Sequence, residues 1–168
     1  MEISRRTVCR WSVIVLLMIC GPLHAQEKSL EEMQKSCRSF VQTFDNWHLR
    51  NLESGGDYSK ALRLKRSAFS PELQRLLGQA EAHNKKTGEA LLDFDPILGG
   101  QDWPKRIVVG KARIQGDRCW VDKAELLFKD GRWIFVNFHY GKDPKYPMNE
   151  NLLSVLKYLL RPEPKKPK

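Results

Sequence analysis

The apolar positions between residues 30 and 47 follow the period of an α-helix. They recur at alternating spacings of three and four residues, at Leu30, Met33, Cys37, Phe40, Phe44 and Trp47. This spacing places them on one stripe of a helix of about five turns. Ser29 and Glu32 form a capping box in front of it. Such an aromatic stripe is usually core, so we do not interpret it as a cofactor site.

Two further helices are indicated by their end signals. Ser70 followed by Pro71 is typical of a helix start, and Gly88 is a typical stop. The buried face between them is predicted to hold Leu73, Leu76, Leu77 and Ala80. Near the C-terminus, Asn149 is predicted to cap a helix that contains Leu152, Val155, Leu156 and Leu159 and ends at Pro162.

Between these helices the apolar period changes from 3.6 to 2, which predicts strands. A first strand covers residues 108–114, and the sequence QGDR turns the chain. A second strand follows, with Trp120, Ala124, Leu126 and Phe128, and the sequence KDG turns it again. The third, RWIFVNFHY, is so apolar that we predict a central strand covered on both faces. The predicted class is α+β, with N-terminal helices packed on one face of a curved antiparallel sheet and a short C-terminal helix.

The N-terminus has the parts of a secretory signal peptide. Arg5, Arg6 and Arg10 precede the apolar run WSVIVLLMIC, and Ala25 offers a cleavage site. We expect residues 1–25 to be removed and the protein to be periplasmic or secreted, with no stable membrane span after cleavage. An uncleaved anchor is disfavoured by the short apolar run, and a lipid on Cys20 by the large residues before it.

The formal charge of +9 does not indicate a nucleic-acid partner. Cleavage would remove three arginines and one glutamate and leave +7. Residues 161–168, RPEPKKPK, hold four cations and one glutamate and are predicted to form an extended, disordered tail. The remaining body, one domain at 26–160, therefore carries only +4, too little for the concentrated patch of a nucleic-acid binder.

The stretch LLDFDPILGGQDWP places Asp93, Asp95 and Asp102 close together, followed by Trp103. Three interpretations stay open. The carboxylates could ligate calcium, although the spacing misses the usual calcium loop. One could be a pocket acid with a raised pKa. We favour the third, in which Asp93 or Asp95 accepts backbone N–H groups while Pro96 and the two glycines turn the chain.

The strand RWIFVNFHY is the other candidate. Strict alternation would put Trp133, Phe135, Asn137 and His139 on one face, a mixture suited to a small-molecule pocket. His139 beside an Asp could then act as a general base. The simpler alternative, which we favour, is a hydrogen-bonded or solvated histidine at the end of a strand. No Ser–His–Asp order, phosphate-binding glycine loop or zinc spacing is present, so we predict neither a cofactor nor a metal.

Cys37 and Cys119 both remain after cleavage. An oxidising compartment would permit a disulfide between them, worth about 2–4 kcal/mol for a loop of about 80 residues. Two separate buried thiols are the alternative, because Cys119 could point away from the helix. The sequence leaves this open.

Four segments, SPELQRLL, DFDPILGGQDWP, VGKARIQGDRCWV and GRWIFVNFHYG, resemble a bacterial family of secreted proteins of unknown function. The resemblance covers about residues 37–160. It implies a cone-shaped α+β fold of the nuclear transport factor 2-like or cystatin-like kind, in which helices close over a bent sheet, often around a pocket. The family has no agreed activity, so the resemblance transfers no catalytic residue.

Two functions fit these observations. The first is a non-enzymatic secreted module that binds a small molecule or a periplasmic protein partner through the segment from Asp93 to Trp103 and the face of Trp133, Asn137 and His139. The second is an isomerase- or hydrolase-like enzyme on the same scaffold, which needs a buried carboxylate beside His139. Asp95, Asp102 and Asp122 are its candidates.

Overall fold

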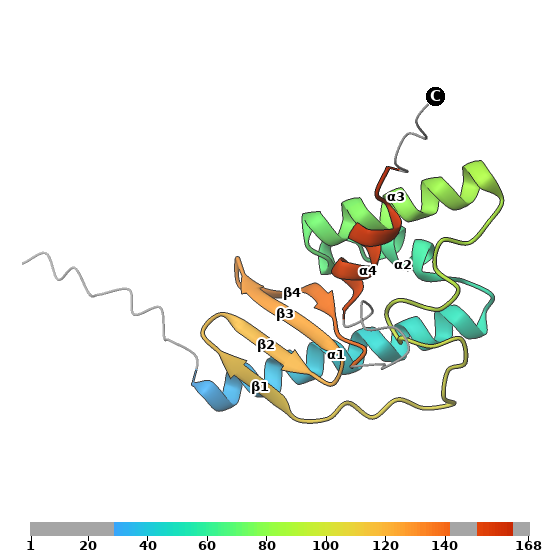
Figure 1. The fold of residues 1–168 in the computed structure, drawn as a ribbon. Coiled ribbons are helices and arrows are strands. Elements are labelled where there is room, and N and C mark those ends of the chain that lie inside the picture. The colour runs from blue at the N-terminus through green and yellow to red at the C-terminus, as the bar shows by residue number, and fades with distance from the viewer. Residues whose placement is uncertain (1–28, 142–150, 163–168) are drawn as a thin grey trace, which may run out of the picture.

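A computed structural model describes residues 29–141 and 151–162 of the chain (Figure 1). The predicted signal peptide and residues 163–168 of the predicted tail lie outside this range. The described part is α+β, as predicted: long helices, then an antiparallel sheet, then a short helix. The elements in chain order are α1 (Leu30–Glu53), α2 (Tyr58–Leu64), the 3₁₀ turn η1 (Arg66–Ala68), α3 (Pro71–Thr87), β1 (Ala112–Gln115), β2 (Arg118–Val121), β3 (Ala124–Lys129), β4 (Arg132–Phe138) and α4 (Leu152–Leu159).

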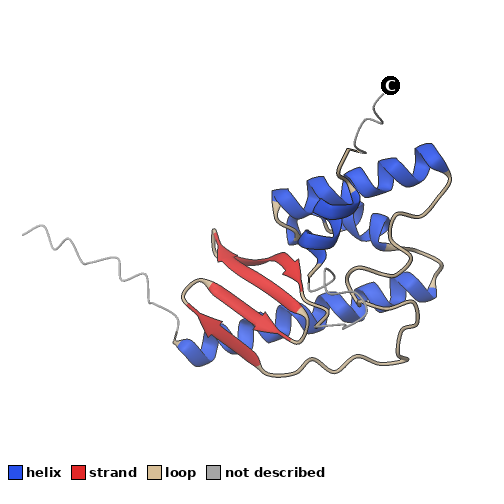
Figure 2. Ribbon diagram, viewed as in Figure 1, coloured by secondary structure: helices blue, strands red, loops and turns tan. Residues whose placement is uncertain are grey.

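Helix α1 lies across one face of the sheet, as Figures 1 and 2 show. The predicted capping box is present, since Ser29 and Glu32 bond each other's amides. The buried stripe is shifted from the predicted one and runs through Cys37, Val41, Phe44, His48 and Leu52. Phe40 and Trp47 lie at its edge and Leu30 is exposed. Two polar residues, His48 and Asn51, are therefore buried on a helix face that otherwise builds the core.

The sheet is a four-stranded antiparallel meander in the order β1-β2-β3-β4. The predicted second strand is in fact two strands, because Asp122 and Lys123 form a tight turn between Val121 and Ala124. Asp122 adopts a left-handed backbone conformation there, with φ 49°. Aspartate tolerates this backbone region better than most residues. Because neither residue of the turn is a glycine, the pattern of apolar residues gave no sign of a turn and predicted one continuous strand.

Strand β4 contains a β-bulge that changes which residues share a face. Leu126 pairs with Phe135, whereas Ala124 pairs with Phe138, so one extra residue of β4 lies between them. Phe135 and Phe138 consequently both face α1, together with Trp133. Asn137 pairs with Glu125 and faces the other way. The prediction that Trp133, Phe135, Asn137 and His139 share one face is therefore wrong, since it assumed unbroken alternation.

The remaining helices cover the β4 side of the sheet. Phe69 forms a bridge with Phe135, and the Ser70 N–H donates to the Phe135 carbonyl, which shields the edge of β4. Ser70 caps α3 and Gly88 ends it in the left-handed conformation, as predicted. Helix α4 packs on α3 and β4. Its cap is Asn151 and not Asn149, which lies outside the described residues.

None of the helices in the described ranges combines the length and the apolarity that crossing a bilayer requires.

A carboxylate cleft beside a buried histidine

The loop between α3 and β1 is fixed by Asp95. One carboxylate oxygen, Oδ1, accepts the N–H groups of Ile97 and Leu98 at 3.0 and 2.8 Å. The backbone of Asp95 also closes a turn with Gly99 and Gly100. The capping interpretation is confirmed for Asp95, whereas Asp93 is exposed. Within the described residues, no group of three His, Cys, Asp or Glu side chains is placed to hold a metal ion.

The second carboxylate oxygen of Asp95 lies 3.0 Å from Nε2 of His48. This histidine is completely buried. Its other ring nitrogen, Nδ1, has no hydrogen-bond partner in the described part of the chain. Because a carboxylate oxygen can only accept, the Nε2–H group of His48 donates this hydrogen bond to Asp95. The pair joins α1 to the loop, 47 residues further along the chain.

Tyr140 holds the same loop from the end of β4. Its hydroxyl donates to the Pro96 carbonyl at 2.6 Å, and its ring meets Phe94 edge-on. Burial raises the pKa of Tyr140, and the nearby Asp95 carboxylate raises it further, so the hydroxyl stays a donor. Gly99 is required at this contact, because a Cβ there would lie 2.8 Å from the ring of Tyr140 and its φ is +70°.

A cleft of about 320 Å³ opens between α1, this loop and the β2–β3 turn. Its apolar wall includes Val41, Ile97, Ile107, Val121 and Phe138. Three carboxylates border it, from Asp45, Asp102 and Asp122, together with the ammonium group of Lys123. Asp122 Oδ2 accepts the Gly110 N–H at 2.9 Å and Lys123 Nζ donates to the Leu98 carbonyl at 2.8 Å, so these two side chains also hold the walls.

The pKa of Asp45, one of the three carboxylates of the cleft, departs clearly from its ordinary value. It lies one turn before His48 on α1 and is partly buried. Burial raises the pKa of Asp45 to about 7; His48 opposes the rise, and the carboxylates of Asp122 and Asp95 add to it. No hydrogen-bond partner of its side chain is found among the described residues. Asp45 therefore titrates near neutral pH at the wall of a cavity.

The residues predicted from the sequence are divided among several places. Asp93, Asp95 and Trp103 border a hollow of about 440 Å³, and Asp102 borders the Asp45 cleft. Trp133 borders an aromatic groove on another side of α1. Asn137 is buried, and its Oδ1 accepts the N–H groups of Phe138 and Leu153, which is a structural role. The predicted Trp133–Asn137–His139 pocket is not formed.

His139 pairs with Glu125 Oε2 at 2.8 Å on the face opposite Trp133. A carboxylate does lie beside His139, but it belongs to Glu125 and to none of the predicted Asp95, Asp102 and Asp122; Asp95 pairs with His48. Sequence reasoning missed both His48 and Asp45. One signal could have found His48: it continues the four–three spacing of Cys37, Val41 and Phe44, and a histidine on a buried stripe needs a partner.

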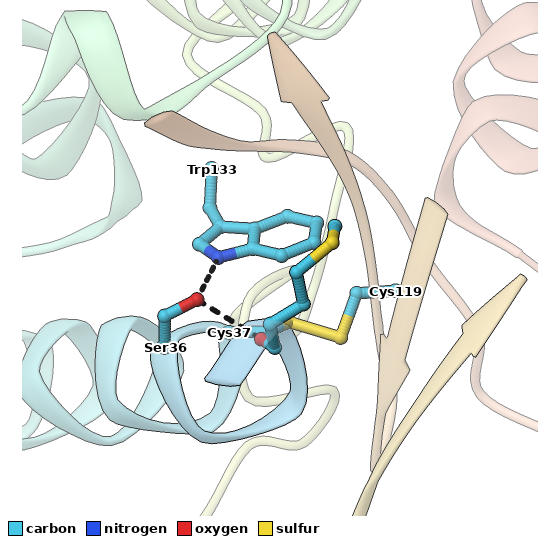
Figure 3. Close-up of a disulfide and its surroundings, with 5 residues drawn as sticks. Ser36, Cys37, Cys119 and Trp133 are labelled. Carbon is cyan, nitrogen blue, oxygen red and sulfur yellow. Dashed lines mark hydrogen bonds between the residues drawn. A yellow bond between two sulfur atoms is a disulfide. The ribbon is translucent and has the colours of Figure 1, made fainter. Parts of the chain in front are cut away.

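The two cysteines form a disulfide that joins α1 to β2 (Figure 3). Cys119 faces α1 because it shares its strand face with Val121, and both are buried. The sequence left open whether Cys119 points toward α1 or away from it, and its position on β2 shows that it points toward Cys37.

Comparison with known proteins gives no match to a family model, a curated protein or a solved structure.

Loss of the Asp95 carboxylate should destabilise the protein. We expect Asp95→Ala to lower the free energy of unfolding by about 1–3 kcal/mol, because two amides and the buried His48 lose their partner. Asp95→Asn should cost less, since the amide oxygen can still accept both N–H groups. The matched control is Asp93→Ala, expected to change stability by less than about 0.5 kcal/mol. The free energy of unfolding is measured by urea denaturation of each protein with and without calcium. If calcium stabilised the unmutated protein but not the Asp95 variants, the capping role would be contradicted.

Proposed function

We propose that the protein is a secreted or periplasmic binding protein, without enzymatic activity, that holds a small ligand with a positively charged group in the Asp45 cleft. The observation that carries this proposal is the partly buried Asp45 carboxyl, which faces a cavity and bonds no described residue. A volume of about 320 Å³ lies within the usual range for small-molecule sites, about 300–1,000 Å³.

The negative charge of the cleft favours a ligand that carries a positive charge. The whole chain is strongly basic, at +9, yet the cleft has three carboxylates and one lysine. Lys123 is already engaged with the Leu98 carbonyl. An ammonium or guanidinium group beside Asp45 would regain, through a charge-assisted hydrogen bond, the interactions that burial takes from the carboxylate.

The proposal also includes the cellular compartment of the protein and the family to which it belongs. A structural disulfide persists in oxidising compartments, which supports export. The expected signal peptide at residues 1–25 agrees with this. A long helix lying across a four-stranded antiparallel meander supports the cone-shaped, cystatin-like or nuclear transport factor 2-like family suggested by the resemblance. In that fold the loop at 93–103 would lie at the mouth of the cone.

The test uses simple probes of known charge. We expect the mature protein to bind butylamine and agmatine in preference to butyrate and 1-butanol, measured by titration calorimetry. Affinity should rise as the pH increases from 5 to 8, because Asp45 loses its proton over this interval. At pH 8, Asp45→Asn should weaken binding by about tenfold or more.

The matched control is Asp117→Asn, which changes an exposed carboxylate in the β1–β2 turn. It should leave binding and its pH dependence unchanged. Equal affinity for the amine, the alcohol and the carboxylate would contradict the proposal, as would binding of the amines that Asp45→Asn does not weaken.

One observation favours a second function. A carboxyl with a pKa of about 7 is suited to general acid–base catalysis, so Asp45 could transfer protons in an isomerase- or hydrolase-like reaction. This enzyme would use Asp45 in place of the predicted His139. A reaction whose rate depends on a group of pKa near 7, and which Asp45→Asn abolishes, would favour it over simple binding.

A further inference from the structure

A second cavity lies along another side of α1 and differs from the carboxylate cleft in both shape and charge. It is a groove of about 590 Å³ between α1, η1 and the β3–β4 hairpin. Five aromatic rings form most of its wall, those of Phe40, Phe44, Trp47, Phe128 and Trp133. We refer to it as the aromatic groove. Its size and apolar wall are those of a site for a small organic molecule.

The rings of the wall are held in place by packing on Phe135, which does not line the groove, and on one another. The Phe44 ring packs on Phe135 with centroids 4.7 Å apart, and Phe40 packs on the same ring at 5.2 Å. Trp133 packs on Phe128 at 4.9 Å. A groove whose rings are already fixed loses little conformational freedom when a ligand enters, which favours binding.

The polar atom of the Trp133 side chain is already satisfied. Its Nε1 donates to Ser36 Oγ at 3.0 Å, and this hydroxyl donates in turn to the Met33 carbonyl (Figure 3). The neighbouring residue, Cys37, joins α1 to β2 through the disulfide. Trp133 therefore contributes apolar surface to the groove and keeps its N–H bonded to α1.

The charged side chains at the groove are all cationic. Lys65 and Arg132 border it, and both are exposed. Among the described residues that line it, no side chain is acidic. Lys65 Nζ lies 5.1 Å from the centroid of the Trp47 ring, so one cation is held directly over the aromatic wall. Hydroxyl groups of Ser39, Thr43 and Ser67 add hydrogen-bonding capacity at the same surface.

We propose that the aromatic groove binds a small anionic amphiphile, a molecule with an apolar body and a carboxylate, sulfate or phosphate head group. The apolar body lies against the rings, and the head group pairs with Lys65 and Arg132. This site is separate from the Asp45 cleft: the two share no lining residue. The two proposals are therefore independent, with ligands of opposite charge.

The experiment compares three probes that share one tail: dodecanoate, dodecanol and dodecyltrimethylammonium, each below its critical micelle concentration. Trp47 and Trp133 line the groove, so intrinsic tryptophan fluorescence reports binding. We expect dodecanoate to bind most tightly. The double variant Lys65→Gln with Arg132→Gln should lose about three- to tenfold in affinity for dodecanoate, and little for dodecanol.

Three controls keep the test specific. Arg75→Gln removes an exposed cation that does not border the groove and should change nothing. Ser39→Trp, at an exposed position of the wall, should fill the groove and weaken all three probes. Asp45→Asn should leave dodecanoate binding unchanged, which separates this site from the carboxylate cleft. Equal affinity for the three head groups, or no binding of dodecanoate, would overturn the proposal.

Discussion

Removing the Cys37–Cys119 disulfide is expected to lower the free energy of unfolding by about 2–5 kcal/mol. The bond closes a loop with a sequence separation of 82 and joins two fully buried residues, so it limits the freedom of the unfolded chain substantially. A domain of this size has only about 5–15 kcal/mol of stability, so the loss is a large fraction of the whole.

The measurement is urea unfolding of the mature protein and of the double variant Cys37→Ala with Cys119→Ala, each with and without dithiothreitol. Reductant should destabilise the unmutated protein towards the level of the variant and leave the variant unchanged. If the unreduced, unfolded protein reacts with a thiol reagent at both cysteines, no such bond exists.

Asp45→Asn is expected to stabilise the protein at pH 8 and to have little effect at pH 4. In the folded state burial raises the pKa of Asp45 to about 7, from an ordinary value of 3.8. The native state therefore keeps a proton that the unfolded state releases, so stability falls as the pH rises from 3.8 to about 7 and levels off above this value. A shift of this size corresponds to about 4 kcal/mol, and screening by solvent at an open cleft lowers the effective value, so we expect about 2–4 kcal/mol.

Asparagine keeps the shape of the side chain without ionising, so the variant should lack this part of the pH dependence. The difference in unfolding free energy between variant and unmutated protein should grow from pH 4 to pH 7 and level off above it. Asp117→Asn is the control and should show no such trend. A difference that is constant with pH would show that Asp45 has an ordinary pKa. The same substitution should weaken amine binding, so stability and binding are expected to change in opposite directions.

The sequence predicted the fold well where local signals are strong. The capping box at Ser29, the Ser70–Pro71 start of α3 and the glycine that ends it are contacts between residues close in the chain. Such contacts can be deduced from spacing alone. The fold class followed from the order of helical and strand-like periods.

The candidate site was harder to predict because tertiary contacts make it. The partner of Asp95 is His48, 47 residues away, and no local pattern pairs them. Asp45 acquires its raised pKa from burial and from the carboxylates of Asp122 and Asp95, which are far from it in the chain. Likewise, the turn at Asp122 and the bulge in β4 shift the alternation on which every assignment of strand faces depended. Long-range contacts decide these features.

The bulge in β4 also places Trp133 and Asn137 on opposite faces of one strand. Before it, Trp133 and Phe135 serve the layer that contains α1 and the aromatic groove. After it, Asn137 turns to the opposite layer and anchors the start of α4 through the Leu153 amide. Trp133 and Asn137, only four positions apart, thus belong to different layers: Trp133 bonds Ser36 and packs on Phe128, whereas Asn137 accepts the N–H groups of Phe138 and Leu153. Their substitutions should be close to additive, so this short strand can be altered for ligand binding at one end without loosening the helix that it holds at the other.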